Sequence, residues 1–130
     1  MARPPSRYPT ELELEILKIF WQQGPRTGRQ VRDALAGRRD LAYTSVMTML
    51  KIMTGKGFLR RKKTAGGFVF HPRVEHQAVA RTMLGDIVAR VFDGSTEAVM
   101  LSLLDQADVD REELGKLREL IDRRAKEEPK

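Results

Sequence analysis

The stretch YTSVMTMLKIMTGKGFLRRKKTAGGFVFHP, residues 43–72, decides the predicted fold. We expect a helix over about residues 44–56, with short hydroxyl side chains on its open side. Two strands, FLRRKK and FVFHP, then flank the turn TAGG. The stretch therefore predicts a helix followed directly by a basic β-hairpin. The apolar residues of this helix that would face a core are Val46, Met49, Leu50 and Met53.

Two further helices are predicted ahead of this stretch, each with a clear start. Thr10 and Glu13 form a capping box, in which each side chain accepts a hydrogen bond from the other residue's backbone N–H. Gly24-Pro25 ends that helix, and Thr27 and Gln30 form a second box before a short basic helix. The apolar stripe of the first helix consists of Leu14, Leu17, Phe20 and Trp21.

The order helix, helix, helix, strand, turn, strand is that of a winged helix-turn-helix domain, which we place at residues 10–73. Residues 1–9 are rich in proline and arginine and are predicted to form a disordered arm. Residues 74–130 are predicted to be a helical dimerisation region. The expected fold class is therefore mainly α with a small β-hairpin wing: a winged helix-turn-helix domain followed by a C-terminal helical dimerisation region.

The dimerisation prediction depends on apolar residues that a single small chain cannot cover. One helix is expected from Val74 to about Phe92, and DGS at residues 93–95 breaks it. The next helix, TEAVMLSLL, is apolar nearly all round, and a last helix begins with a capping box of Asp110 and Glu113. A second copy of the chain is the simplest cover. The predicted interface residues are Leu84, Ile87, Val91, Val99, Met100, Leu101, Leu103, Leu104, Leu114, Leu117, Leu120 and Ile121.

Charge is distributed unevenly along the chain. Residues 1–72 hold 14 Lys and Arg against 5 Asp and Glu, a net charge of +9, whereas residues 73–130 have a net charge of −3. A basic front half indicates a domain that binds a polyanion, and a solvated basic surface is the alternative.

Joined to this order of helices and strands, the charge favours double-stranded DNA. Ser and Thr can hydrogen-bond to base edges, and the threonine methyl can contact the thymine methyl in the major groove. The cations of the hairpin can lie along the phosphate backbone, although cations on an edge strand also guard against aggregation. The predicted DNA-binding residues are Arg29, Tyr43, Thr44, Ser45, Met47, Thr48, Lys51, Arg60, Arg61, Lys62 and Lys63.

Several classes of function find no support in the sequence. The chain has no cysteine, which excludes disulfides, thiolate metal sites and a cysteine nucleophile. His71 and His76 are too few ligands for a metal site, and the carboxylates cluster in helix caps and turns. We therefore expect no metal, no cofactor and no enzymatic activity. No apolar run approaches the ~18–20 residues that span a bilayer, and the N-terminus does not read as a signal peptide, so a cytoplasmic location without membrane insertion is expected.

The chain also resembles the penicillinase repressors, a family of BlaI/MecI-like proteins with copper-responsive CopY relatives. The resemblance covers residues 10 to about 124 and rests on TELELEILKIFW, AYTSVMTMLKIMTGKGFLRRKK, FVFHP and the tail VFDGSTEAVMLSLLDQADVDREELGKLRELI. It implies a homodimeric transcriptional repressor that binds inverted-repeat operator DNA and takes part in antibiotic resistance regulation. The cysteine pairs of the copper-responsive relatives are absent.

The resemblance further implies how repression ends. In the family, a membrane sensor metalloprotease is linked to clipping of the dimerisation helices, and the cut maps here to the bond between Ser102 and Leu103. This chain has Ser-Leu where well-known members have Asn-Phe.

A second function is compatible with the same residues. A winged helix can mediate protein–protein assembly, with its basic wing meeting an acidic partner. Met47 and Ile52 on the helix over residues 44–56 favour this alternative, whereas the hydroxyl-rich side of residues 44–51 favours DNA. An enzyme ranks third, because no nucleophile has a candidate base beside it.

Overall fold

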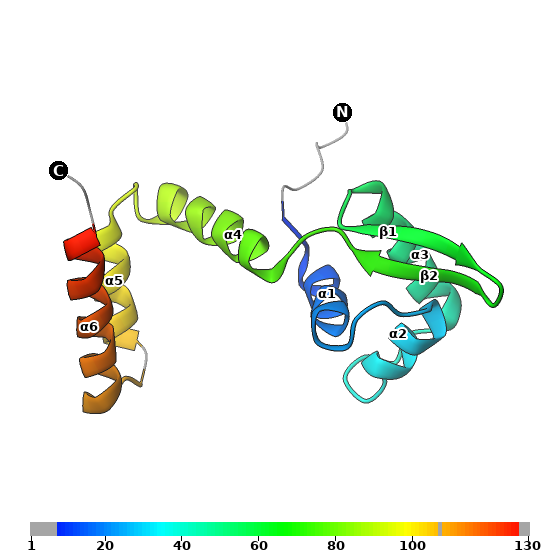
Figure 1. Cartoon of the computed structure of the whole chain (residues 1–130), viewed down its shortest axis with the longest axis horizontal. Coiled ribbons are helices and arrows are strands. Elements are labelled where there is room, and N and C mark those ends of the chain that lie inside the picture. The colour runs from blue at the N-terminus through cyan, green and yellow to red at the C-terminus, as the bar shows by residue number, and fades with distance from the viewer. Residues whose placement is uncertain (1–7, 107, 128–130) are drawn as a thin grey trace. The chain divides into compact units, whose positions relative to one another are not determined.

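Helices and one β-hairpin follow one another in the order that the sequence predicts (Figure 1). The computed structural model describes residues 8–106 and 108–127. The predicted fold class is confirmed in its architecture, mainly α with a small β-hairpin wing, and the last three helices follow the wing. The elements are α1 (Glu11–Gln23), α2 (Gly28–Leu35), α3 (Tyr43–Gly55), β1 (Leu59–Thr64), β2 (Gly67–Pro72), α4 (His76–Val91), α5 (Thr96–Gln106) and α6 (Arg111–Glu127).

Both predicted capping boxes at the start of the chain are confirmed. The Thr10 N–H donates to Glu13 Oε1 at 2.8 Å, and the Glu13 N–H donates to Thr10 Oγ1 at 3.3 Å. Thr27 and Gln30 make the same reciprocal pair at 2.9 and 3.2 Å. Gly24 follows α1 with φ of 83°, a conformation that L side chains avoid, and so ends the helix where predicted.

The core joins α1, α2, α3 and the hairpin, and the buried face of α1 is wider than predicted. Leu17 and Phe20 are buried as expected, whereas Leu14 and Trp21 are only half-buried. Ile16 and Ile19 are buried in addition, because both α2 and β2 contact α1 and cover more than one stripe of it. The core residues contributed by the other elements and the connection before β1 are Val31, Leu35, Val46, Leu50, Met53, Phe58, Leu59 and Phe70.

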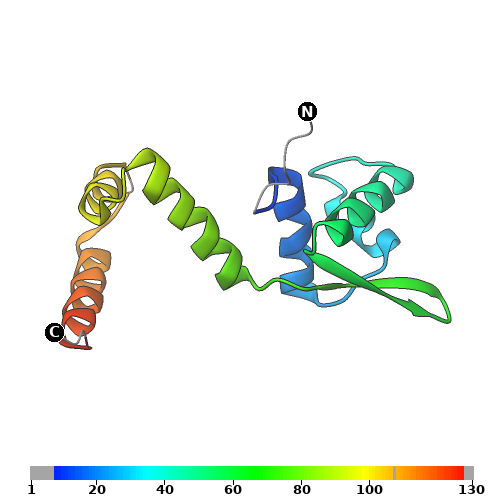
Figure 2. The same ribbon diagram turned by 90° about the horizontal axis from the view of Figure 1, so that it is seen from above.

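The strands β1 and β2 pair antiparallel in a register that runs from Leu59 opposite Pro72 to Thr64 opposite Gly67. The hairpin turn projects beyond the helices of its own unit (Figures 1 and 2). Its base is fastened on a second edge, where Phe70 and Arg26 exchange backbone hydrogen bonds of 2.8 and 3.1 Å. The wing is therefore held at its base on both edges of β2.

The chain divides into two compact units, one that ends at Asp86 and one that begins at Ile87, so the division falls inside α4. The predicted functional boundary between residues 73 and 74 stays a prediction. Of the predicted N-terminal arm, residues 1–7 lie outside the described residues, Tyr8 is half-buried and Pro9 is buried. Among the described residues, no helix is long and apolar enough to cross a membrane.

Candidate nucleic-acid interface

The open face of α3 carries the short polar side chains that the sequence predicts there. Val46, Leu50 and Met53 turn into the core, and Met49 is half-buried against it. Because these positions recur on one side of the helix, the other side is left to solvent. Within the described residues, no side chain caps the start of α3, so its first N–H groups lack that partner. The exposed residues of this face are Thr44, Ser45, Thr48, Lys51 and Ile52.

Thr48 has a defined orientation on this face. Its hydroxyl donates to the Thr44 carbonyl oxygen at 2.9 Å, one turn earlier in the same helix. Such a bond fixes the side-chain torsion and occupies the hydroxyl proton. The oxygen keeps its capacity to accept a hydrogen bond. Thr48 therefore presents an acceptor and a methyl group to whatever lies against α3.

The starts of α2 and α3 meet at a glycine. A Cβ added at Gly28 would lie 2.3 Å from Met47 Sδ, so Met47 fills the space that a side chain at residue 28 would need. Met47 is half-buried and packs against the core, unlike the exposed residues around it. Beside it, the Arg29 guanidinium lies 5.3 Å from the centre of the Tyr43 ring. The structure thus brings Arg29 and Tyr43 together, whereas Met47 packs against Gly28 and the core.

The four cations of β1 lie on two different sides of the hairpin. Side chains alternate along a strand, so Arg61 and Lys63 share a side with the buried Leu59, and Arg60 and Lys62 take the other. Sequence reasoning treated the four as equivalent, because it lacked the strand register that fixes these sides.

Arg61 is the cation of the wing that lies beside α3. Its guanidinium carbon is 4.4 Å from the centre of the Phe68 ring, a favourable cation–π distance. With Lys51 and Thr54 of α3, Arg61 lines a cavity of about 290 Å3. The cavity places two cations and a hydroxyl group between the exposed face of α3 and the wing.

Two acidic residues of α1 form ion pairs with the segments just before and just after α3. The Glu13 carboxylate, 1% exposed, accepts hydrogen bonds from the Thr10 N–H at 2.8 Å and from Lys56 Nζ at 2.9 Å. Glu15 accepts one from Arg39 Nε at 2.6 Å. Burial pulls the pKa of Glu13 upward, but the hydrogen bonds from Thr10 and Lys56 outweigh it and leave the pKa below its ordinary value. Sequence reasoning missed both ion pairs.

The C-terminal helices expose the apolar residues that the sequence assigned to an interface. In this single chain, no described residue of α5 or α6 is fully buried. Leu101 is 62% exposed, and it lines a cavity of about 560 Å3 on α5 together with Ser102, Leu104 and Asp105. The other large apolar side chains that are exposed on α4, α5 and α6 are Leu84, Ile87, Val91, Leu103, Leu104, Leu114, Leu120 and Ile121, whereas Val99, Met100 and Leu117 are half-buried.

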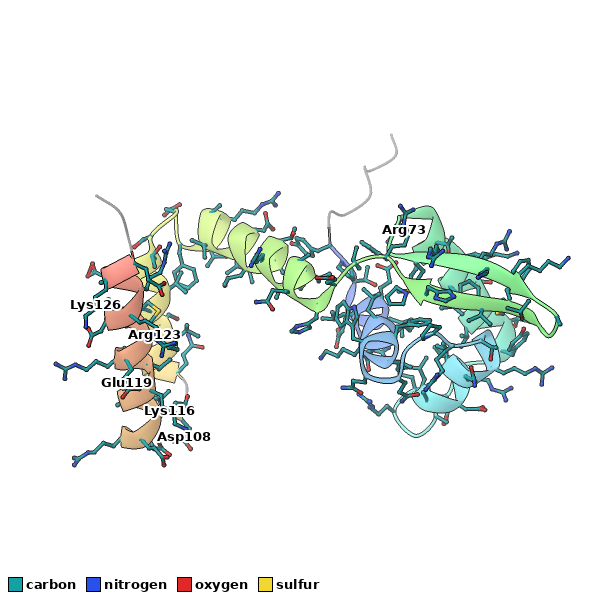
Figure 3. The ribbon with its side chains drawn as sticks, in the orientation of Figure 1. Arg73, Asp108, Lys116, Glu119, Arg123 and Lys126 are labelled. Carbon is teal, nitrogen blue, oxygen red and sulfur yellow. The ribbon has the colours of Figure 1, made fainter. Side chains whose placement is uncertain are left out.

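The last helix has a charged side as well as an apolar one. Leu114, Leu117 and Ile121 recur at spacings of three and four, which puts them on one side of α6. The helix begins at a cap in which Asp110 Oδ1 accepts from the Glu113 N–H at 2.8 Å. The charged side chains of the opposite side follow one another along α6 in Figure 3: Lys116, Glu119, Arg123 and Lys126.

The described ranges 8–106 and 108–127 contain no group of three or more His, Asp or Glu side chains arranged to hold a metal ion. His76 packs its ring against Trp21 instead, with the ring centres 5.1 Å apart. The expectation that no metal or cofactor is needed stays a prediction.

Known proteins are similar to this chain over most of its length. The transcriptional regulator BlaI of Mycobacterium tuberculosis is 31% identical over 114 residues, which are 82% of this chain and 83% of that protein. The methicillin resistance regulatory protein MecI of Staphylococcus aureus (strain N315) is 20% identical over 112 residues, 86% of this chain and 91% of that protein. The solution structure of the Bacillus licheniformis BlaI monomeric form in complex with the blaP half-operator covers 59% of this chain and 92% of its own, at 25% identity and a TM-score of 0.48.

The family comparison decides the assignment. The model of the penicillinase repressor family matches residues 9–123, which include every described helix start, the hairpin and most of α6. The predicted resemblance is thereby confirmed. Since that match and the 31% identity to the mycobacterial regulator both extend over most of the 130 residues, the chain belongs to the penicillinase repressor family.

Proposed function

We propose that this chain is a homodimeric transcriptional repressor that binds inverted-repeat operator DNA through α3 and the wing. The observation that carries the DNA-binding part is the group of exposed polar side chains on the open face of α3, with Lys51 beside Arg61 of the wing. Family membership supports the role in transcription, since matched relatives are named transcriptional regulator and resistance regulatory protein. In this proposal the chain has no catalytic activity of its own.

Sequence would be read by the short side chains of α3 in the major groove. The Thr48 oxygen can accept a hydrogen bond from the amino group of adenine or cytosine, and its methyl group can contact a thymine methyl. Thr44 and Ser45 lie exposed at the start of the same helix, the part of a recognition helix that contacts bases. Arg29 and Tyr43 adjoin this end of α3, and in this proposal they would contact the DNA backbone.

Thr48→Val is expected to weaken binding to the selected operator by about 1–3 kcal/mol and to leave binding to random duplex unchanged. Valine keeps the shape and a methyl group but removes the acceptor. The operator is first selected from a random duplex library with the wild-type protein, and both affinities are then measured in competition. Thr48→Ser, which keeps the hydroxyl and loses the methyl, is the matched control. Equal losses on operator and random duplex would show that Thr48 does not read sequence.

Phosphate contacts would come mainly from the side of the wing that adjoins α3. Arg61 and Lys63 are on that side, and Arg61 shares a cavity with Lys51. Arg60 and Lys62 lie on the opposite side of the strand. There they would raise the positive electrostatic potential near the DNA but would reach the phosphates less directly than Arg61 and Lys63. We therefore propose unequal contributions from the four cations.

Arg61→Ala is expected to reduce the slope of log affinity against log salt by about 0.9, the value for one phosphate contact on duplex DNA. Lys62→Ala, the neighbouring cation on the opposite side of the hairpin, is the matched control and should change the slope by less than half as much. The measurement is a salt titration of binding to random duplex, where base contacts do not contribute. Equal changes in slope for both variants would contradict the assignment of sides.

We also propose that α4, α5 and α6 form the dimer interface. The exposed leucines of α5 and the apolar side of α6 support this, because a second copy would cover them and form a symmetric contact. The charged side of α6 would then face solvent (Figure 3). Repression would end when a membrane sensor metalloprotease leads to cleavage in α5, with Ser102–Leu103 as the proposed bond, because the winged helices would then bind DNA singly.

A protein-binding winged helix remains the second candidate. Ile52, 45% exposed on the open face of α3, favours it, because a base-reading surface has less use for a large aliphatic side chain. The two functions are separated by the library selection above: a protein-binding module would recover no consensus sequence from random duplex.

A further inference from the structure

Three contacts join α4 and the residues just before it to Tyr8 and to Trp21 of α1. The indole N–H of Trp21 donates to the Val74 carbonyl oxygen at 2.9 Å, just before α4 starts. The Trp21 ring meets the ring of His76, the first residue of α4, edge-on at 82°. The Tyr8 hydroxyl donates to Asp86 Oδ2 at 2.8 Å. We name these five residues, Tyr8, Trp21, Val74, His76 and Asp86, the α4 clamp.

The α4 clamp contacts α4 at two positions, His76 and Asp86. His76 and Asp86 are ten positions apart, which is about 15 Å along a helix. Contacts at two positions about 15 Å apart restrict the direction of α4 relative to α1 more than a contact at one position would. Val79, 7% exposed, lies between the two points and is the one buried residue of the described α4. All of these contacts lie within the compact unit that ends at Asp86.

We infer that the α4 clamp determines which spacing between operator half-sites the protein accepts. The inference rests on the proposed dimeric function, in which α4 leads from each winged helix to the interface. When two binding modules are joined, the gain from the second contact is greatest where the connection matches the span of the sites, and a stiffer connection narrows that match. In DNA, one base pair of extra spacing moves a half-site by about 3.4 Å and turns it by about 35°. A connection whose direction is restricted at the winged helix should tolerate such changes less well than a free one.

Trp21 and Tyr8 would thus be positioning residues that act through α4, away from any DNA contact. The sequence pattern places Trp21 only on the apolar stripe of the first helix. It packs partly against the core and also sends its N–H to the connection after the wing. Loss of the clamp would leave base readout intact and relax the geometry between two half-sites.

The test uses the full chain and the variants Trp21→Phe, Tyr8→Phe and their combination. Phenylalanine keeps an aromatic ring and removes the N–H or hydroxyl donor. Each protein is titrated against duplexes that carry one half-site, or two half-sites at the selected spacing and at one and two base pairs more or less. The wild-type protein should lose about tenfold or more in affinity at a shift of one base pair. The double variant should lose only two- to threefold, with half-site affinity within twofold of wild type.

Gln77→Ala, an exposed residue in the first turn of α4, is the matched control and should keep the sharp spacing profile. A double variant with an equally sharp profile overturns the inference, and so does a wild-type protein that tolerates every spacing. If Trp21→Phe loses half-site binding because the winged helix is destabilised, Tyr8→Phe decides alone, because the half-buried Tyr8 lies outside the core cluster. If the wild-type protein selects only single half-sites from the library, that result contradicts the proposed dimeric function itself, and the inference about the α4 clamp falls with it.

Discussion

Leu101→Asp is expected to make the protein monomeric and to weaken binding to a two-half-site operator by about 10²–10⁴-fold, the gain that linkage of two modules provides. Leu101 is the most exposed leucine of the chain and sits beside the cavity on α5, so a second copy would bury it. A carboxylate placed in that contact without a partner costs several kcal/mol. Cleavage in α5 would have the same consequence, so the variant imitates the proposed release from DNA.

The measurement is sedimentation equilibrium together with titrations of full operator and single half-site. Half-site affinity and the fluorescence of Trp21 should be unchanged, because the substitution lies outside the unit that contains the winged helix. Arg123→Asp, on the charged side of α6, is the matched control and should remain dimeric. A Leu101→Asp protein that sediments as a dimer and binds operator normally would place the interface elsewhere.

Lys56→Met is expected to lower the free energy of unfolding at pH 7 by about 2–3 kcal/mol. The substitution leaves the buried Glu13 carboxylate without its ammonium partner, and loss of one member of a fully buried pair typically costs ~3–5 kcal/mol. The expected cost is smaller here because the Lys56 side chain is 23% exposed, so water can reach the site, and the Thr10 N–H still donates to Glu13. Lys18→Met, an exposed lysine of α1, is the control and should change stability by less than ~0.5 kcal/mol.

The difference between wild type and Lys56→Met should depend on pH. The pKa of Glu13 is lowered in the folded protein, so the stabilisation from its charged form is fully present above the unfolded pKa of ~4.3 and is lost as pH falls through the folded pKa. Urea unfolding of both proteins at pH 7 and below pH 4 should therefore give curves that converge in acid. Glu13→Gln in the Lys56→Met background should recover part of the lost stability at pH 7. A gap that stays constant with pH would rule out the charge as its cause.

The starts of α1 and α2 and the end of α1 could be predicted because the information is local. A capping box needs only residues three apart, as in Thr10 and Glu13, and a glycine with positive φ stops a helix wherever it stands, as Gly24 does. The break at residues 93–95 follows from the turn residues DGS, and the start of the last helix follows from the cap of Asp110, which are local signals of the same kind. The order of these elements was enough to predict a winged helix.

The exposure of candidate site residues could be predicted where the residues lie on one face of a single helix. It was harder to predict where residues of different helices or strands pack together. Thr44, Ser45, Thr48 and Lys51 are exposed on α3 because helical spacing alone separates them from Val46 and Leu50. Met47 is half-buried because the sequence-distant Gly28 offers it space.

The sequence by itself therefore determined the polar face of α3 and the apolar faces of the last helices, which depend on neighbours within a few residues. It also determined the fold class and the family resemblance, which depend on the order of such local signals along the chain. Only the tertiary structure decided which cations of the wing adjoin α3, that Glu13 is buried against Lys56, and that Trp21 and Tyr8 hold α4. The physical reason is separation along the chain: Lys56 is 43 residues from Glu13, and Asp86 is 78 residues from Tyr8. No periodicity or local motif links residues so far apart, and packing of the core brings them within hydrogen-bonding distance.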